Sequence, residues 1–393
     1  MSETFLRSGT MGSVRISIGI LAYNEESAIE GTIGSISGQS IIKDLPTGWS
    51  VEIICVANGC RDKTAIVASE AINTLVDSVG DRRVSGRTEI VERASKENAW
   101  NEFVHRLSDR QSEFLIFMDG DIRLLDQDTL ITLIQELQKH PRAYVCGART
   151  VKSIELKQRQ TILERISLAA SDLRRHATEV AFAGCLYAAR SQACRRLRLP
   201  LIMRGEDSFL RAIWCTDFFT VSVNQADSTR IISAPNARVM FEAYLSPSQV
   251  LKNLRRRAVG MTIHSMLYDR LWSESTPETD GGALLLRWHE QDPDWDQKLL
   301  RQKIKERENW IPGGGATFYQ WASPRGDLWK WFRRMRGMPL VRKIKQFPVA
   351  AIATCLNLYA GIAAHRLIRS GKLDDLWFTT HTRLPDEPSR NEQ

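Results

Sequence analysis

Several motifs that identify common enzyme classes are missing from this chain of 393 residues. It contains no G-x-S-x-G, no G-x-x-x-x-G-K-[ST] and no G-x-G-x-x-G, so hydrolases, P-loop proteins and dinucleotide-binding enzymes are not indicated. The cysteine count of seven is odd and no C-x-x-C pair occurs, which argues against a disulfide framework or a zinc site. The composition, with 43% hydrophobic and 25% charged residues, is that of a folded globular protein.

The chain also lacks a strong targeting or membrane signal. Its first residues do not follow the basic-then-apolar order of a signal peptide, so we expect a cytoplasmic protein. Residues 347–364 carry no charge, but the stretch is only mildly hydrophobic and barely long enough to cross a bilayer. A buried core helix is preferred for it, ahead of an interfacial segment and then a membrane span.

Acidic residues are absent from residues 329–345, which are rich in arginine and lysine. The formal net charge of +8 is therefore partly gathered into one local basic region. Tryptophan and arginine side chains there suit an anionic membrane surface. We expect peripheral contact with the cytoplasmic face of a membrane through residues 329–364, and no nucleic-acid partner.

Short apolar runs alternate with helical patterns over the first 150 residues or so. Strands are predicted at residues 14–22, 51–57, 88–92, 114–118 and 143–148. This alternation predicts an α/β fold whose mostly parallel sheet is covered by helices on both faces. The alternation fades near residue 245, so two domains are predicted, 1–245 and a mainly helical region 246–393.

Three polar clusters follow predicted strands, at residues 23–26, 58–62 and 119–121. Ligands of open parallel sheets bind outside the carboxyl ends of the strands. The three clusters are therefore expected to meet at one edge of the sheet and to form a binding site. Taken singly, each cluster could equally be ordinary loop and capping chemistry.

Two carboxylates, Asp119 and Asp121, flank Gly120 directly after a wholly apolar predicted strand. Their hard oxygen atoms suit Mg²⁺ or Mn²⁺, which typically combine one or two carboxylates with substrate phosphates. A solvated turn is the alternative reading of the D-x-D triplet, and the buried strand before it weakens that alternative.

A second acidic pair, Glu206 and Asp207, stands at a predicted helix start, with Ser208 as the expected first helical residue. A carboxylate here could act as a general base toward an acceptor hydroxyl, or serve only as a first-turn acid favoured by the helix dipole. Lys96 could meet a phosphate as a point charge, or lie at a solvated helix start.

Taken in chain order, five segments resemble the motifs of family 2 glycosyltransferases of the GT-A fold. They read ISIGILAYNEE, VEIICVANGCRDKT, ASKENAWN, FLIFMDGDI and GEDSFL, and they span roughly residues 14–215. The resemblance implies a nucleotide-diphospho-sugar transferase domain with a Rossmann-like sheet. Residues 1–245 would be its catalytic domain, and residues 246–393 would bind the acceptor or associate with a membrane.

The resemblance also implies roles for individual residues. Asp207 would be the catalytic base with Glu206 beside it, and Asp121 and Asp119 would hold Mn²⁺ or Mg²⁺. Asn58 stands where the family commonly has an aspartate that reads the base, which leaves the nucleotide open. The nucleotide-sugar site would be lined by Ala22, Tyr23, Glu25, Asn58, Asp62, Lys96, Asp119, Gly120, Gly184, Cys185 and Arg257.

The expected reaction moves a sugar, with inversion, from a nucleotide-diphosphate sugar to a hydroxyl group. A UDP-sugar is the favoured donor, and the acceptor would be a sugar, a lipid-linked sugar or a small molecule in bacterial glycan, glycolipid or metabolite synthesis. The segment LKNLRRRAVG lacks the tryptophan of the Q-x-x-R-W motif, which disfavours a processive synthase. Two alternatives stay open: a sugar-nucleotide pyrophosphorylase-like enzyme, and a non-catalytic basic protein that binds membrane or nucleic acid.

Overall fold

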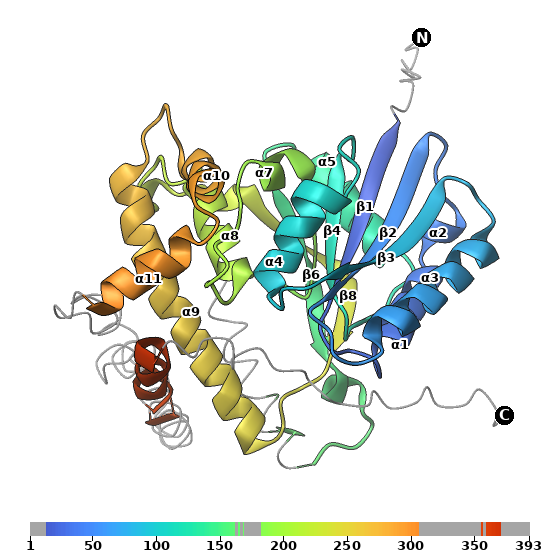
Figure 1. Cartoon of the computed structure of the whole chain (residues 1–393). Coiled ribbons are helices and arrows are strands. Elements are labelled where there is room, and N and C mark those ends of the chain that lie inside the picture. The colour runs from blue at the N-terminus through green and yellow to red at the C-terminus, as the bar shows by residue number, and fades with distance from the viewer. Residues whose placement is uncertain are drawn as a thin grey trace, which may run out of the picture.

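The computed structural model describes residues 13–161, 164–165, 168, 182–305, 355–356 and 359–370. One eight-stranded sheet organises this part of the chain, in the order β3-β2-β1-β4-β7-β6-β8-β5 (Figure 1). The strands are β1 Val14–Ala22, β2 Trp49–Asn58, β3 Val84–Val91, β4 Phe114–Asp119, β5 Arg123–Leu124, β6 Val145–Lys152, β7 Leu186–Arg190 and β8 Ile231–Phe241.

The first half of the sheet is parallel and the second half is mixed. Strand β1 pairs in parallel with β2 and β4, and β2 pairs in parallel with β3. Strand β7 runs antiparallel between β4 and β6, while β6 and β8 are parallel and β5 closes the edge antiparallel to β8. The predicted α/β fold with a mostly parallel sheet is therefore confirmed, and the carboxyl ends of β1, β2 and β4 meet at one edge.

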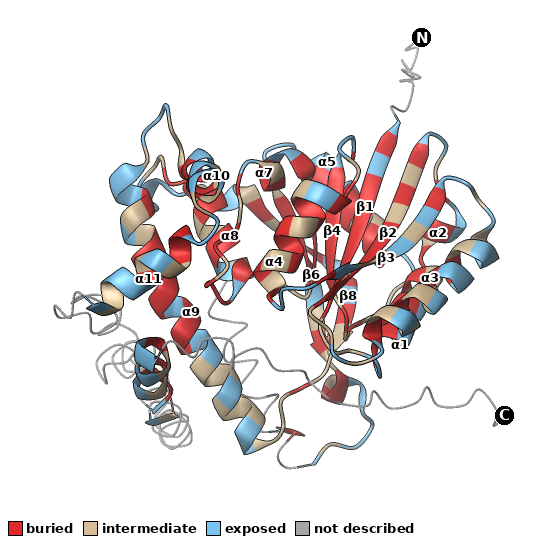
Figure 2. Ribbon diagram, in the orientation of Figure 1, coloured by how far each residue is buried: buried red, intermediate tan, exposed pale blue. Residues whose placement is uncertain are grey.

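Helices cover both faces of this sheet. The longer ones are α1 Ile29–Ser37, α3 Thr64–Val79, α4 Lys96–Glu102, α5 Thr129–Lys139, α8 Glu206–Cys215, α9 Pro247–Glu274, α10 Gly281–Gln291 and α11 Trp295–Lys305; α2 Ser40–Lys43 and α7 Ser191–Arg195 are short. Figure 2 shows buried residues concentrated in the strands and on the helix sides that face them. The result is a three-layer arrangement with two separate hydrophobic cores.

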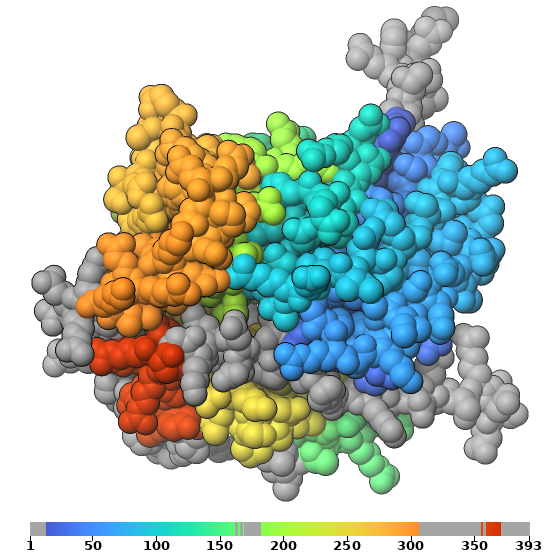
Figure 3. Space-filling model, in the orientation of Figure 1, coloured from blue at the N-terminus to red at the C-terminus, as the bar shows by residue number. Residues whose placement is uncertain are grey.

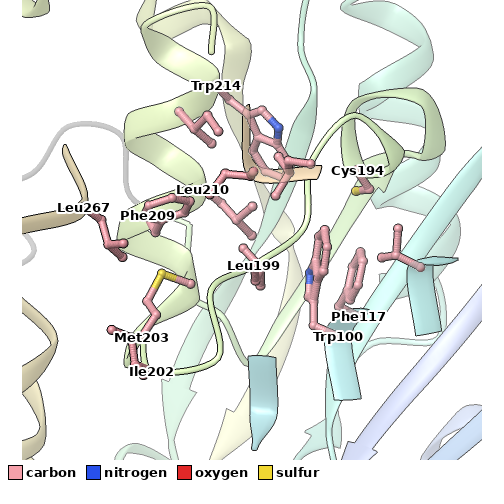
Figure 4. Packing of buried hydrophobic residues seen from close by; sticks show 14 of the residues in the cluster. Trp100, Phe117, Cys194, Leu199, Ile202, Met203, Phe209, Leu210, Trp214 and Leu267 are labelled. Carbon is pink, nitrogen blue, oxygen red and sulfur yellow. The ribbon is translucent and has the colours of Figure 1, made fainter. Parts of the chain in front are cut away.

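Alternating side chains divide each central strand between the two cores. In β4, Phe114, Ile116 and Met118 face the core under α1, α3 and α5, while Leu115 and Phe117 face the other one. The second core continues through α4, α8 and α9, which contribute Trp100, Trp214 and Leu267 to one cluster (Figure 4). Because both faces of the strand are covered, its sequence reads as a continuous apolar run.

The C-terminal helices share the second core rather than forming one of their own. Residues of α9, α10 and α11 belong to the same buried cluster as Phe117 and Tyr187 of the sheet. In the space-filling view, α10 and α11 lie directly against the N-terminal half of the chain (Figure 3). Helix α9 begins at Pro247, capped by the Ser246 side chain, close to the predicted boundary at residue 245.

Several predicted element bounds need correction. Strand β3 is longer than the predicted 88–92, and β8 was not predicted, because its exposed positions break the apolar run. Helix α8 begins at Glu206 rather than Ser208, so both acids lie in its first turn. Helix α4 begins at Lys96, and the turn that follows it, Phe103–Leu107, is a π-helix.

Within the described residues, no helix combines the length and the apolar character that a membrane span needs. Most of the stretch predicted to contact a membrane, 329–354 and 357–358, lies outside those residues. The described helical residues 359–370 bury Ala360, Ala364 and Ile368 in the second core. All seven cysteines are free, as predicted from their odd number and spacing.

Candidate active site at the carboxyl ends of the parallel strands

The loops after β1 and β2 are fastened to each other by hydrogen bonds. The Asn24 side-chain oxygen accepts from the Arg61 amide at 2.7 Å, and the Glu25 amide donates to Thr64 Oγ1 at 2.8 Å. Asn24 adopts a left-handed backbone with a φ of 53°, a conformation that asparagine tolerates better than most residues. These bonds bring Tyr23 and Glu25 to the edge of the sheet on a fixed loop.

Asp62, predicted to line the nucleotide site, is used largely within this loop pair. One of its oxygens accepts from the Thr64 amide at 3.0 Å, where α3 begins, and the other accepts from the Glu26 amide at 3.2 Å. Asp62 precedes Lys63, the N-cap of α3, and it holds backbone amides of both loops.

Asn58, at the end of β2, is 1% exposed and supports the start of α4. Its side-chain oxygen accepts from the Ser95 amide at 3.3 Å, and the Ser95 hydroxyl in turn accepts from the Asn98 amide as the N-cap of α4. An N-cap of this kind fixes the first turn of a helix. That turn carries Lys96 toward the sheet edge.

Lys96 is the centre of the site. Its ammonium nitrogen lies 2.6 Å from Asp119 Oδ1 and 2.7 Å from Glu206 Oε1, and it donates to the Gly184 carbonyl at 3.1 Å. Burial opposes the charge, but the two carboxylates outweigh that effect and raise the pKa of Lys96 above its ordinary value. The Lys96 ammonium group thus connects three segments: the end of β4, the turn before β7, and the first turn of α8.

The D-x-D turn follows β4 without room for a larger middle residue. The Asp119 amide donates to the Cys185 carbonyl at 2.9 Å, and the Gly120 amide donates to the Leu21 carbonyl at 3.2 Å. A Cβ on Gly120 would lie only 3.0 Å from the Ala22 Cβ. Glycine therefore lets the turn pack against the end of β1, with both aspartates at the sheet edge.

Several carboxylates lie close together at this edge of the sheet. Burial, together with Asp121, Asp119 and Asp62, raises the pKa of Glu25 to about 9. Burial also raises the pKa of Asp119 to about 6, against the opposing pull of Lys96. Crowded carboxylates of this kind disfavour their charged forms, and a bound cation would relieve the repulsion.

Glu206 and Asp207 face this cluster from the first turn of α8. Gly205, with a φ of 86°, precedes them in a left-handed conformation that favours glycine. Burial and the neighbouring Glu206 raise the pKa of Asp207, while Lys96 and Arg256 lower it. A Cβ on Gly184 would lie 2.5 Å from Glu206 Oε1, so the two segments touch.

Tyr244, which the sequence did not single out, and Arg256 of α9 also influence the charges of this site. The largely buried Tyr244, just after β8, has its pKa raised by burial and influenced by Arg256, Asp121 and Asp119. Among the arginines of α9, the charge of Arg256 reaches both Asp207 and Tyr244. Arg256 and the predicted Arg257 are neighbours on this helix and are both exposed. Recognising β8 in the sequence would have pointed to Tyr244 at its end.

The donor set fits a divalent cation that is shared with a substrate. Among the described residues, no group of three or more His, Cys, Asp or Glu side chains is arranged to hold a metal. Mg²⁺ and similar hard cations, however, often use only one or two carboxylates and take their other ligands from phosphates and water. Asp119 and Asp121 supply that number.

A mostly parallel sheet with a D-x-D turn and an acidic pair facing it defines a glycosyltransferase of the GT-A fold. Residues 17–197 match the model of glycosyl transferase family 2, and this part of the chain belongs to that family. The comparison of the sequence with curated proteins gave no match.

The chain is similar to several solved structures at low sequence identity. The mannosyltransferase PcManGT from Pyrobaculum calidifontis, in complex with GDP-Man and Mn²⁺, is 15% identical with a TM-score of 0.52, over 91% of this chain and 88% of that one. Glucosyl-3-phosphoglycerate synthase from Mycobacterium tuberculosis is 16% identical with a TM-score of 0.41, over 65% and 80% of the chains. TarS from S. aureus is 15% identical with a TM-score of 0.40, over 91% and 92%.

Proposed function

We propose that this enzyme is a metal-dependent, inverting glycosyltransferase that moves a sugar from a nucleotide-diphosphate sugar to a hydroxyl acceptor. The observation that carries the proposal is that acidic residues of β4 and α8 contact Lys96 from two sides. Asp119 lies 2.6 Å from its ammonium nitrogen on one side, and Glu206 lies 2.7 Å from it on the other. A donor diphosphate on the Asp119 side would bring its sugar toward Asp207.

The two sides of the site have different chemical tasks. Mn²⁺ or Mg²⁺, when bound at Asp119 and Asp121, would supply positive charge for the diphosphate leaving group. Lys96 adds a fixed positive charge close to the same aspartate. Tyr23, Glu25 and the end of β1 form the neighbouring wall, where the nucleoside is proposed to bind.

Asp207 is proposed to accept the proton of the acceptor hydroxyl. Its raised pKa makes the carboxylate a better proton acceptor than an exposed aspartate, while Lys96 and Arg256 limit the rise. The deprotonated oxygen would attack the anomeric carbon from the face opposite the diphosphate, which inverts the configuration in a single displacement. Glu206, held by Lys96, would keep the first turn of α8 in place.

The donor is expected to be a UDP-sugar, with GDP-sugars as the next class to test. The PcManGT structure, which contains GDP-Man and Mn²⁺, supports a nucleotide sugar and a divalent cation as the kinds of ligand. The acceptor is proposed to be a sugar, a lipid-linked sugar or a small hydroxyl compound. The predicted use in bacterial glycan, glycolipid or metabolite synthesis remains part of this proposal.

The test is a turnover panel on the full chain. UDP-, GDP-, CDP- and dTDP-hexoses are incubated with enzyme and Mn²⁺, alone and with a panel of glycoside, polyprenyl-phosphosugar and glycerol-based acceptors, and nucleoside diphosphate release is recorded. Release with one nucleotide class, lost on chelation, is expected. The same release from the Asp121→Ala variant would contradict the metal assignment, and no release from any donor would favour a non-catalytic role.

A further inference from the structure

The first turn of α8 is attached to α4 at two neighbouring points. Lys96 and Glu97 are consecutive on α4, and their partners Glu206 and Arg204 flank Gly205. We propose that Glu97 and Arg204 are positioning residues, which fix the Gly205 turn and thereby set the place of Asp207 for the transfer. This inference rests on the proposed function, since it concerns the same acidic pair.

The Glu97–Arg204 contact is a buried ion pair. Glu97 is 1% exposed and Arg204 is 7% exposed, and Arg204 Nη1 lies 3.6 Å from Glu97 Oε2. Burial raises the pKa of Glu97, and the charge of Arg204 opposes that rise. The Ser95 hydroxyl donates to the same carboxylate oxygen at 2.8 Å, which orients it toward the arginine.

Arg204 also organises the chain that leads into α8. Its Nη1 donates to the Met203 carbonyl at 2.6 Å and to the Leu201 carbonyl at 3.2 Å. These bonds fold the segment before Gly205 around the guanidinium group. The planar group can donate in several directions at once, which lysine cannot reproduce.

A third element presses on the same turn. On α9, a Cβ at Gly260 would lie 2.2 Å from the Arg204 carbonyl oxygen, so the helix and the turn are in direct contact. The turn before Asp207 is thus enclosed by α4 on one side and α9 on another. Its left-handed Gly205, with a φ of 86°, is held between two fixed neighbours.

Stability alone does not account for such a pair. Replacing a buried ion pair by apolar side chains of similar volume is often neutral or stabilising, because folding then no longer removes two charges from water. Removing one partner is strongly destabilising, because the other charge is left buried alone. If the pair serves to position Asp207, removing both charges together should restore stability but not turnover.

The experiment is a cycle of Glu97→Met, Arg204→Met and the double variant in the full chain. Urea unfolding gives stability, and nucleoside diphosphate release from the donor found in the panel gives turnover. Each single variant is expected to lose both. The double variant is expected to regain wild-type stability while its kcat stays at least tenfold low and its KM for the donor is unchanged.

A remote, more exposed ion pair provides a control. Glu52, six residues before Asn58 on β2, pairs with Arg87 at 3.2 Å at the opposite end of the strand. The Glu52→Gln variant is expected to lose stability but keep its kcat. A double variant that regains both stability and kcat would overturn the positioning role.

Failure of the proposed function is distinguishable from failure of this inference. If wild-type enzyme releases no nucleoside diphosphate from any donor, the proposed function is in question, and hydrogen exchange then tests the pair directly. The amides of Phe209 and Leu210 belong to the first hydrogen-bonded turn of α8. They are expected to exchange at least tenfold faster in the double variant, and wild-type rates there would refute the inference.

Discussion

On the face covered by α1, α3 and α5, the sheet is packed almost entirely with aliphatic side chains. The face under α4, α8 and α9 contains most of the buried aromatic rings as well as aliphatic side chains. The polar groups differ as well. Buried polar residues of the first face are small or neutral, such as Thr32 and Gln39. The second layer contains the buried ionisable residues Glu97, Arg204, Glu206, His264 and Asp296.

The contrast shows which face can carry chemistry. An aliphatic layer gains its stability from close packing and needs no particular orientation of polar groups. Buried charges require specific partners, and those partners fix the direction of each side chain. The second face therefore provides a site whose charged groups are held in place, supported by the stable first face.

The largest effect is expected on the second face, from Asp207→Asn. The amide cannot accept the acceptor proton, so turnover should fall by roughly 100- to 10,000-fold, the usual contribution of a general base. Donor binding should be largely unchanged, because Asp207 is proposed to act on the acceptor. Nucleoside diphosphate release and calorimetric donor affinity are measured together. Retained turnover would remove Asp207 as the base.

Substituting one glycine on each face by alanine compares how the two faces respond to an added methyl group. A Cβ at Gly184 would lie 2.5 Å from Glu206 Oε1, whereas a Cβ at Gly34 of α1 would meet nothing within 4 Å. Gly184→Ala should displace Glu206 from Lys96, lower turnover at least tenfold and cost about 1–3 kcal/mol of stability, as overpacking does.

Gly34→Ala is the matched control on the first face. It should leave turnover unchanged and stabilise the fold by about 0.5–1 kcal/mol, because alanine loses less conformational freedom in a helix. Turnover and urea unfolding are measured for both variants. Equal effects of the two substitutions would show that the faces do not differ in this way.

The aliphatic face should respond in stability alone. Leu133 on α5 is 0% exposed in the first core. Leu133→Ala should cost about 2–5 kcal/mol of unfolding free energy through lost burial and a cavity. Turnover per folded molecule should be unchanged at a temperature where the variant remains folded. A fall in kcat with intact folding would contradict the division of labour between the faces.

The smallest effect concerns acid stability. Burial lowers the pKa of His264 to about 4 in the folded protein. The ring is therefore neutral in the folded protein at a pH where the unfolded chain, with a pKa near 6.5, takes up a proton. The stability due to the neutral ring is present above pH 6.5 and is lost as pH falls toward 4. His264→Met should remove about 1 kcal/mol of the stability loss between pH 7.5 and 5.5. An identical pH dependence in both proteins would contradict this account.

The fold could be predicted from the sequence because its central strands are continuous apolar runs with clear ends. The apolar runs ending at Ala22, Asn58 and Asp119 each stop at a polar cluster, and parallel strands place those clusters together. Strand β8 could not be recognised, because Pro235 and Asn236 are turn signals in its middle, where its pairing with β6 is irregular. Tyr244, which follows it, was missed for the same reason.

The site could be predicted only in outline. Motif order indicated Lys96, Asp119 and the acids at 206–207, which the structure brings together. The Glu97–Arg204 pair depends on two segments that are distant in sequence, and a charged residue in a helical pattern is normally read as exposed. Asn58 and Asp62 turned out to hold backbone groups, a use that residue type alone does not distinguish from ligand binding.

Calorimetric titration of UDP, GDP, CDP and dTDP into the purified protein tests the central claim most directly. It is done with Mn²⁺, with chelator, and with the Asp121→Ala variant, whose circular dichroism shows whether it is folded. We predict that one nucleotide binds in the presence of Mn²⁺ and that chelator or the substitution abolishes binding. Equal binding under all three conditions, or no binding of any nucleotide to the folded protein, would contradict a metal-dependent nucleotide site at this edge of the sheet.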